Sequence, residues 1–102
     1  MADAAPSTWL ARVRVMLKPV INDPQGKAIE NGLVSLGFTG VRQVRAGKYL
    51  EIQITAADAA EAQRQTDDMC RKLLANPVIE DYTFEVELLT ETGARGSSPQ
   101  PV

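Results

Sequence analysis

Residues 18–31 constrain the fold of this chain most strongly, because this segment has to end a strand, turn and begin a helix within a few residues. Pro19 and Pro24 each fix the backbone φ angle and remove a hydrogen-bond donor. Asp23 occupies the expected N-cap of a helix, and Pro24 follows at the first helical position, where a missing N–H costs nothing. The sequence therefore predicts a stiff connector between a strand and a helix.

A first helix is predicted over residues 24–36. Ile29, Leu33 and Leu36 recur at helical spacing, so they are expected to form a buried stripe. Gly37 follows, and a glycine just past a helix supplies the left-handed residue that ends many helices. Phe38 is then expected to fold back on the helix end.

Four segments have the alternation of half-buried strands. They cover residues 10–18, 41–45, 49–54 and 79–89. The clearest is 49–54, in which Leu50, Ile52 and Ile54 share one face. Between the second and third strands, residues 46–48 are expected to form a hairpin turn, with Gly47 available for a positive φ angle.

A second helix is predicted to run to about Ala75. Thr55 and Asp58 have the spacing of a capping box, with a shorter acid in the usual Glu/Gln position. The helix is expected to stop at Asn76-Pro77, since the residue before a proline avoids the α region. Its buried stripe is expected to comprise Ala59, Ala62, Thr66, Met69, Cys70 and Leu73.

The order βαββαβ predicts an α+β fold, a two-layer sandwich of ferredoxin-like order. It has a four-stranded antiparallel sheet with two helices on one face. In the usual form of this topology the first strand is central, between the third and the fourth. Arg12 and Arg14 on that strand would then face Glu51 on one side and Glu85 and Glu87 on the other. Such cross-strand pairs contribute roughly 0.2–1 kcal/mol each.

Composition bounds the domain organisation and the class of function. At 102 residues the chain is long enough for one domain with a thin core. We expect a flexible N-terminal tail at 1–8, a single folded domain at 9–89 and a disordered C-terminal tail at 90–102. A net charge of −2 argues against a nucleic-acid or anionic-membrane partner. A lone cysteine, no spanning segment and no secretory signal favour the cytoplasm.

Catalytic devices are scarce in this sequence. Histidine is absent, which removes the commonest general base and metal ligand at neutral pH. Asp67 and Asp68 are neighbours on a helix and point in different directions, and Cys70 lies on an apolar stripe. The acidic cluster could bind a metal, but a salt-bridged sheet face is the favoured interpretation; its members are Glu80, Asp81, Glu85, Glu87 and Glu91.

Two further patterns allow a ligand and have a simpler explanation. The turn from Arg45 to Lys48 places two cations beside a glycine, which could form an anion nest, yet it lacks the serial glycines of a nucleotide loop. The βαββαβ order is shared with RNA-recognition domains, which stack bases on exposed aromatic side chains. Here the outer sheet face offers Tyr49 as its one aromatic, so RNA binding is disfavoured.

Several short sequence segments of the chain resemble those of a known family. They include VRVMLKP at 13–19, DPQGKAI at 23–29, LGF at 36–38, VRAGKY at 44–49 and LANPVIEDY at 74–82. Together, in this order from about 11 to 87, they are similar to PurS, the small subunit of phosphoribosylformylglycinamidine (FGAM) synthase. One departure is clear: the family commonly has a glycine after the first proline, where this chain has Val20 and Ile21.

The resemblance implies a non-catalytic subunit in de novo purine biosynthesis. The complex would convert FGAR, glutamine and ATP to FGAM, with ATP and Mg on a large synthetase subunit and ammonia released by a glutaminase subunit. This chain would carry no catalytic residue, no cofactor and no metal. It would act as a homodimer or a dimer of dimers that bridges the other two subunits and supports ammonia transfer.

Stiff turns are the predicted contact regions, since a preorganised surface loses less entropy on docking. They comprise Lys18, Pro19, Asp23, Pro24, Gln25, Gly26, Arg45, Gly47, Lys48, Asn76 and Pro77. Two alternatives stay open from the fold alone. One is a stand-alone metabolite-sensing module, which a glycine-rich first loop would favour. The other is a small hydrolase of acylphosphatase type, whose phosphate-cradling glycine loop is absent here.

Overall fold

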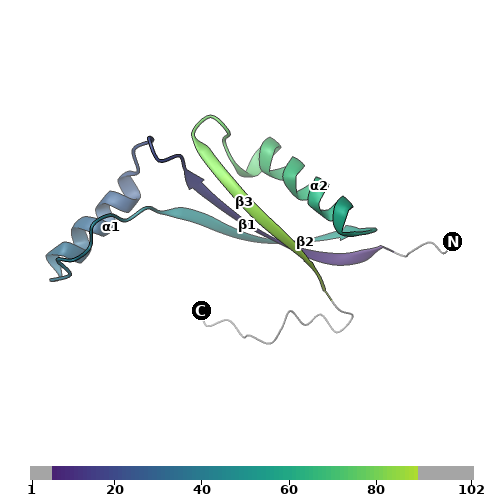
Figure 1. The fold of residues 1–102 in the computed structure, drawn as a ribbon, viewed down its shortest axis with the longest axis horizontal. Helices are drawn as coiled ribbons and strands as arrows, with labels where there is room; N and C mark the ends of the chain where they lie inside the picture. Colours follow the sequence, from purple (N-terminus) through teal and green to yellow (C-terminus); the bar gives the residue numbers. More distant parts are fainter. Residues whose placement is uncertain (1–5, 90–102) are drawn as a thin grey trace.

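A computed structural model describes residues 6–89, and these residues form three strands and two helices. Along the chain they are β1 (Ser7–Leu17), α1 (Pro24–Ser35), β2 (Gly47–Ala56), α2 (Ala59–Met69), the π-helical turn η1 (Cys70–Leu74) and β3 (Glu80–Leu88) (Figure 1). The strand β1 thus begins two residues before the predicted body of the domain. The predicted tail at 90–102 and the first five residues lie outside the described residues.

The sheet is antiparallel with the order β2-β1-β3, so the prediction that the first strand is central is confirmed. In this register Arg12 lies opposite Glu51 on one side and Glu85 on the other, as the charge pattern predicted. The α+β class is also confirmed.

The prediction of a fourth strand was wrong for the described residues. Residues 41–45 form no strand. They belong to the return leg from α1 and lie beyond the end of the sheet, where no strand runs beside them to pair with (Figure 1). An alternation only five residues long cannot distinguish such a leg from an edge strand.

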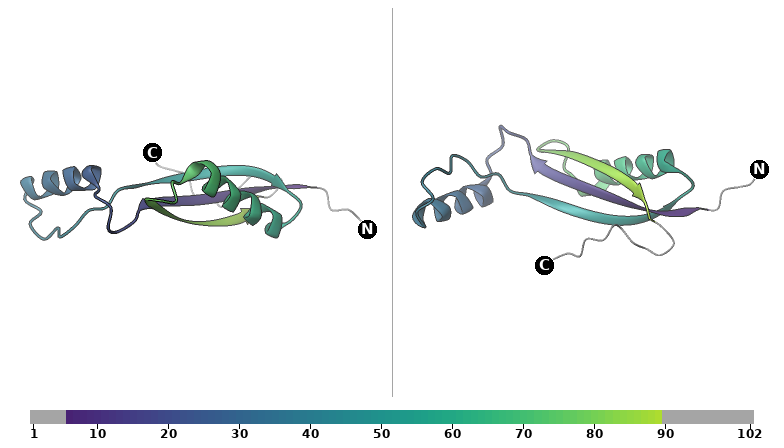
Figure 2. Two further views of the ribbon diagram at one scale, coloured as in Figure 1. Left: turned by 90° about the horizontal axis from the view of Figure 1, so that it is seen from above. Right: turned by 60° about the horizontal axis from the view of Figure 1, so that its bottom comes forward.

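The two predicted helices on one sheet face are not found either. Helix α2 covers one face of the sheet, whereas α1 extends past the sheet end in every view (Figure 2). Residues 18–46, here called the arm, therefore project from the body of the domain. The stiff turn after β1 directs α1 outward instead of back across the strands.

The core lies between α2 and the sheet. One cluster joins Val13 and Val15 of β1 to Cys70 and Ala75, and Tyr82 and Phe84 pack against it. The neighbouring cluster consists of Ile54, Ala56 and Ala62, with Trp9 and Met69 against it. Both clusters form without a contribution from α1.

Helix α1 has the predicted ends. The side chain of Asp23 accepts a hydrogen bond from the Gly26 N–H at 2.9 Å, which is the expected N-cap. At the other end Gly37 has φ 104°, and the N–H groups of Gly37 and Phe38 donate to the carbonyls of Val34 and Leu33. These are the two hydrogen bonds of a Schellman motif, so the predicted glycine stop is confirmed.

The predicted burial of the α1 stripe was wrong within one chain. Ile29 is 43% exposed and Leu36 76% exposed, because the arm carries the helix away from the sheet. Gly26 is the one buried residue of α1. Phe38, expected to fold back on the helix end, is 57% exposed.

Helix α2 differs from its prediction at both ends. Its cap is Asp58, whose carboxylate accepts from the Glu61 N–H, while the Glu61 carboxylate accepts from the Ala57 N–H. The capping pair therefore lies three residues later than the one predicted at Thr55. At the C-terminal end, the Ala75 N–H bonds the Cys70 carbonyl, and this wider π turn leaves Leu73 82% exposed.

Gly47 begins a strand and not a hairpin turn. Gly37 is the one glycine with a positive φ angle among the described residues, so the prediction for Gly47 was wrong. The position needs a glycine for a different reason. A Cβ there would overlap the Val15 carbonyl oxygen and the Met16 side chain on the neighbouring strand.

Two glycines of α1 make a matched pair of substitutions. A Cβ at Gly26 would overlap the Val44 carbonyl oxygen and the Asp23 carboxylate, whereas a Cβ at Gly32 meets nothing within 4 Å. We expect Gly26→Ala to destabilise the arm by about 1–3 kcal/mol. Gly32→Ala should stabilise α1 by about 0.5–1 kcal/mol, because glycine is costly inside a helix.

Amide hydrogen exchange across α1 measures both effects, since it reports the free energy of local opening. Faster exchange in Gly26→Ala and slower exchange in Gly32→Ala are the expected results. Equal effects of the two substitutions would contradict the packing described at Gly26.

Candidate functional site

The predicted contact regions come together at one end of the sheet. The turn after β1, the leg that leads into β2 and the turn before β3 all lie where α1 leaves the body (Figure 1). The Lys18 N–H donates to the Ile79 carbonyl at 2.8 Å, which ties the first and third of these segments together. Gln25, Gly47, Lys48 and Glu80 line one shallow hollow there.

Asp23 is the charged residue at the centre of this end. It is 8% exposed, and its carboxylate accepts from the Gly26 N–H at 2.9 Å and from the Ala46 N–H at 2.8 Å. These two backbone donors, followed by the positive charge of Arg45, lower the pKa of Asp23. The carboxylate thus caps α1 and ties the outgoing leg of the arm to the returning leg.

Arg45 makes the opposite connection. Its guanidinium donates to the carbonyls of Leu17 and Lys18, each at 3.0 Å, and to that of Ile21 at 3.5 Å. Residues 17–23 and 44–47 are therefore cross-linked by two charged side chains, and we call these two segments the neck. The anion nest, which the sequence disfavoured at this turn, gains no support from Arg45, because its guanidinium donates to carbonyls of the chain itself.

The turn before β3 is held by its own side chains. The Asn76 side chain accepts from the Val78 N–H, and the Glu80 carboxylate accepts from the Asn76 N–H at 2.7 Å. The carbonyl of Asn76 also accepts from the N–H groups of Ile79 and Glu80. These hydrogen bonds hold the backbone of the turn, which leaves the Val78 side chain 77% exposed.

Three acidic residues of β3 pair with cations of β1 or with Lys18, which directly follows that strand. Arg14 donates to Glu85 at 2.9 Å, Arg12 pairs with Glu87, and Lys18 pairs with Asp81 at 2.8 Å. The Arg14 hydrogen bond lowers the pKa of Glu85. The predicted salt-bridged face is confirmed for these residues, and Glu91 lies outside the described residues.

Within residues 6–89 no group of side chains is arranged to hold a metal ion. Cys70 is fully buried, and burial raises the pKa of its thiol, which confirms that it is a core residue. The Tyr82 hydroxyl donates to Asp67, and this hydrogen bond raises the pKa of Tyr82. None of the described helices combines the length and the apolar character that crossing a bilayer requires.

Comparison with known proteins identifies the family. A family model described as PurS, phosphoribosylformylglycinamidine (FGAM) synthase, matches residues 10–88. This chain belongs to the PurS family. The match spans β1 to β3, so it includes the arm and the neck.

Curated relatives agree over the same span. The PurS subunit of phosphoribosylformylglycinamidine synthase from Synechocystis sp. is 51% identical over 82 residues, which is 80% of this chain and 82% of that protein. The PurS subunit from Bacillus subtilis is 46% identical over 79 residues, covering 78% of this chain and 93% of that protein.

Solved structures of the family have the same fold. PurS from Methanocaldococcus jannaschii superposes with a TM-score of 0.73 at 36% identity, covering 80% of this chain and 99% of that one. A chain of the PurLQS structure from Thermotoga maritima superposes with a TM-score of 0.70 at 29% identity, covering 80% and 98%. The resemblance to PurS that the short sequence segments indicated is confirmed.

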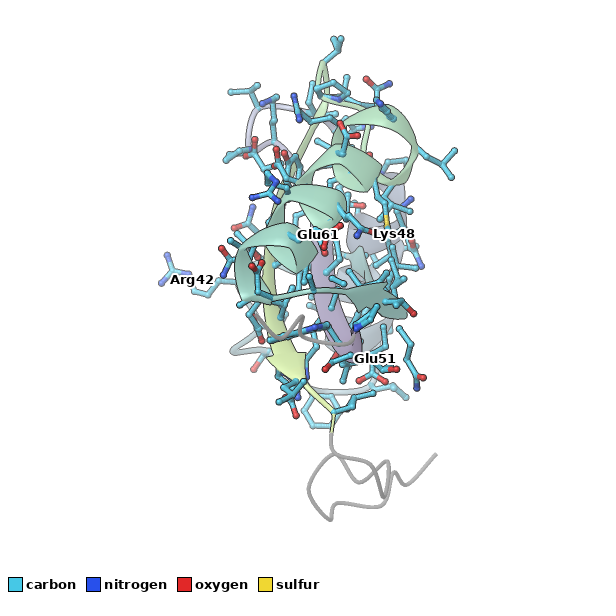
Figure 3. The ribbon with its side chains drawn as sticks, turned by 90° about the vertical axis from the view of Figure 1, so that its right-hand side faces the viewer. Arg42, Lys48, Glu51 and Glu61 are labelled. Atoms are coloured by element: carbon cyan, nitrogen blue, oxygen red, sulfur yellow. The ribbon has the colours of Figure 1, made fainter. Side chains whose placement is uncertain are left out.

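One set of exposed residues was missed by the sequence reasoning. The arm presents Val34 on α1 and Leu36 and Phe38 at its tip, all at least 44% exposed. The sequence held a signal: a helix of 12 residues with two glycines is marginal in water without packing, so its apolar stripe needs a cover. Arg42 on the same arm points away from the body (Figure 3).

The lowered pKa of Asp23 predicts acid sensitivity of the neck. A depressed carboxyl pKa stabilises the folded state above the ordinary value of about 3.9, and this stabilisation is lost as pH falls through the lower folded value. Protection of the α1 amides should therefore decrease as pH is lowered from about 5 to about 2. Asp23→Asn should flatten that dependence, because the neutral side chain does not titrate.

Hydrogen exchange, corrected for the intrinsic pH dependence of amides, measures this difference. Other charged side chains, Lys27 and Glu30, line the same hollow as Asp23 and Arg45. The exchange profile of the wild type is therefore compared with that of Asp23→Asn, so that only the contribution of the Asp23 carboxylate differs. Identical corrected profiles for the two proteins would contradict the role given to the Asp23 carboxylate.

Proposed function

We propose that this chain is the small, non-catalytic subunit of an FGAM synthase. The observation that carries the proposal is the family match over residues 10–88, which extends to a chain of a PurLQS complex. The proposed role is to bridge the synthetase and glutaminase subunits in de novo purine biosynthesis, in the cytoplasm. ATP and Mg are proposed to bind the large synthetase subunit.

The site geometry supports a docking role. The described residues place charged side chains in pairs, bury the thiol and direct polar groups of the neck toward the backbone. The exposed features of these residues are two turns held by hydrogen bonds and an arm with apolar side chains. A preorganised surface of this kind loses little entropy when it meets a partner.

Ammonia transfer gives such a surface a chemical task. Free ammonia is the reactive form, and it is lost by protonation in bulk water. A bridging subunit supports the transfer by holding two active sites in register and by excluding solvent along the joint. The stand-alone metabolite-sensing module is not favoured by the family match.

The proposed quaternary state is a homodimer or a dimer of dimers, in which a second copy covers the apolar residues of the arm. Leu36 and Phe38 are 76% and 57% exposed in one chain. Burying side chains of this size is worth about 1.5–3 kcal/mol each. A second copy would supply the packing that a helix of 12 residues needs in water, independently of any other subunit.

Reconstitution tests the proposed function. The purified chain is mixed with the synthetase and glutaminase subunits, and glutamine-dependent amidination of FGAR is measured. Activity should depend on the chain, whereas amidination with added ammonium should depend on it much less, because that nitrogen source needs no bridge. Equal glutamine-dependent activity with and without the chain would show that it does not assemble the complex.

Light scattering on the isolated chain tests the dimer. The double substitution of Leu36 and Phe38 by Asp should weaken self-association at least tenfold, because central apolar contacts carry most of the energy of an interface. Leu88→Asp is the matched control, since Leu88 is 52% exposed but lies at the other end of the sheet. A wild-type monomer at micromolar concentration would contradict the dimer.

A further inference from the structure

The direction of the arm needs a cause within the chain. An α1 helix folded back over the strands would bury Ile29 and Leu33 against the same molecule, as in a closed two-layer sandwich. The observed chain instead carries α1 beyond the sheet end (Figure 2). The neck is the only covalent connection between α1 and the sheet, so its conformation determines where the helix lies.

The two legs of the neck are held together by charged hydrogen bonds. Arg45 of the returning leg binds the carbonyls of Leu17, Lys18 and Ile21 on the outgoing leg. Asp23 of the outgoing leg binds the Ala46 N–H of the returning leg. Hydrogen bonds to charged groups are the stronger ones, and these run in both directions across the neck.

Packing closes the same junction. Gly26 lies against the Val44 carbonyl so closely that no Cβ fits between them. Asp23 is almost fully buried there. Rotating α1 back toward the sheet would separate the legs, break these contacts and leave a buried carboxylate with fewer donors, which is costly.

We propose that Asp23 and Arg45 are positioning residues that hold α1 outward and so commit its apolar stripe to a second copy of the chain. They act through the backbone of the neck. The pair selects association between chains over closure within one chain. This part of the proposal rests on the dimer proposed above, whereas the outward position of α1 does not.

Two substitutions isolate the pair. In Asp23→Asn the side-chain oxygen can still accept from the Gly26 N–H, since asparagine is a good N-cap. The amide NH₂ group then faces the Ala46 N–H, so the hydrogen bond to the returning leg is lost. Arg45→Lys keeps the charge and loses the planar fork that reaches three carbonyls. Asp58→Asn is the matched control: Asp58 caps α2 through the Glu61 N–H in the same way and, among residues 6–89, bonds to no second segment.

Spin labels on one chain measure the position of α1 directly. Asn31→Cys on α1 and Arg64→Cys on α2 are both exposed sites, and the buried Cys70 stays unlabelled. The doubly labelled chain is diluted into unlabelled chain of the same variant, so that the distance is measured within one molecule. Light scattering on each variant gives the dimer dissociation constant, and circular dichroism verifies that the sheet remains folded.

Wild type and Asp58→Asn should show one long, narrow distance distribution. Asp23→Asn and Arg45→Lys should add a shorter or broader population and weaken the dimer about tenfold or more. Unchanged distances in both neck variants would overturn the proposal. If the distances change while wild type is itself monomeric, the neck holds the arm as proposed and the dimer proposal fails, so the two failures are distinguishable.

Discussion

The structure depends on one constraint: α1 is too short and too rich in glycine to be stable without packing, and its own sheet does not cover it. Isolated helices below about 12–15 residues are marginal in water even with favourable composition. Helix α1 has 12 residues and includes Gly26 and Gly32. Capping at both ends stabilises the first and last turns of α1, but its apolar side chains remain exposed. A chain built in this way is incomplete as a single molecule, which agrees with a protein that works as a subunit.

The neck fixes the position of α1 relative to the sheet. A flexible connector would let α1 settle wherever apolar surface is available, including on its own sheet. The cross-links made by Asp23 and Arg45 remove this freedom, and the glycine at position 26 lets the two legs approach closely. The body of the domain is independent of the arm, since both core clusters close between α2 and the sheet. The protein thus combines a self-sufficient body with an arm directed outward.

The sequence predicted local structure well and the placement of α1 poorly, for a physical reason. Asp23, Pro24 and Gly37 act through their own backbone neighbours, so their effects on α1 could be read directly, and the pairing of Arg12 and Arg14 with β3 followed from strand register. Where α1 packs depends on contacts between Arg45 and carbonyls more than twenty residues away, which no periodicity encodes. The same limit explains residues 41–45, whose alternation suits a strand although none lies beside them. The predicted contact residues were found at one end of the sheet, while the exposed tip of the arm at Leu36 and Phe38 was missed because its residues appeared to belong to a core.

Isotope-filtered NMR on a mixture of labelled and unlabelled chains tests the central claim, that a second copy covers the arm. The methyl groups of Ile29, Leu33 and Leu36 are observed in the labelled chain, and contacts to protons of the unlabelled chain are selected. We expect strong intermolecular contacts at these methyl groups and much weaker ones at Val13 and Val15, which are already buried within the body. Contacts from the arm methyl groups only to their own chain would contradict the central claim.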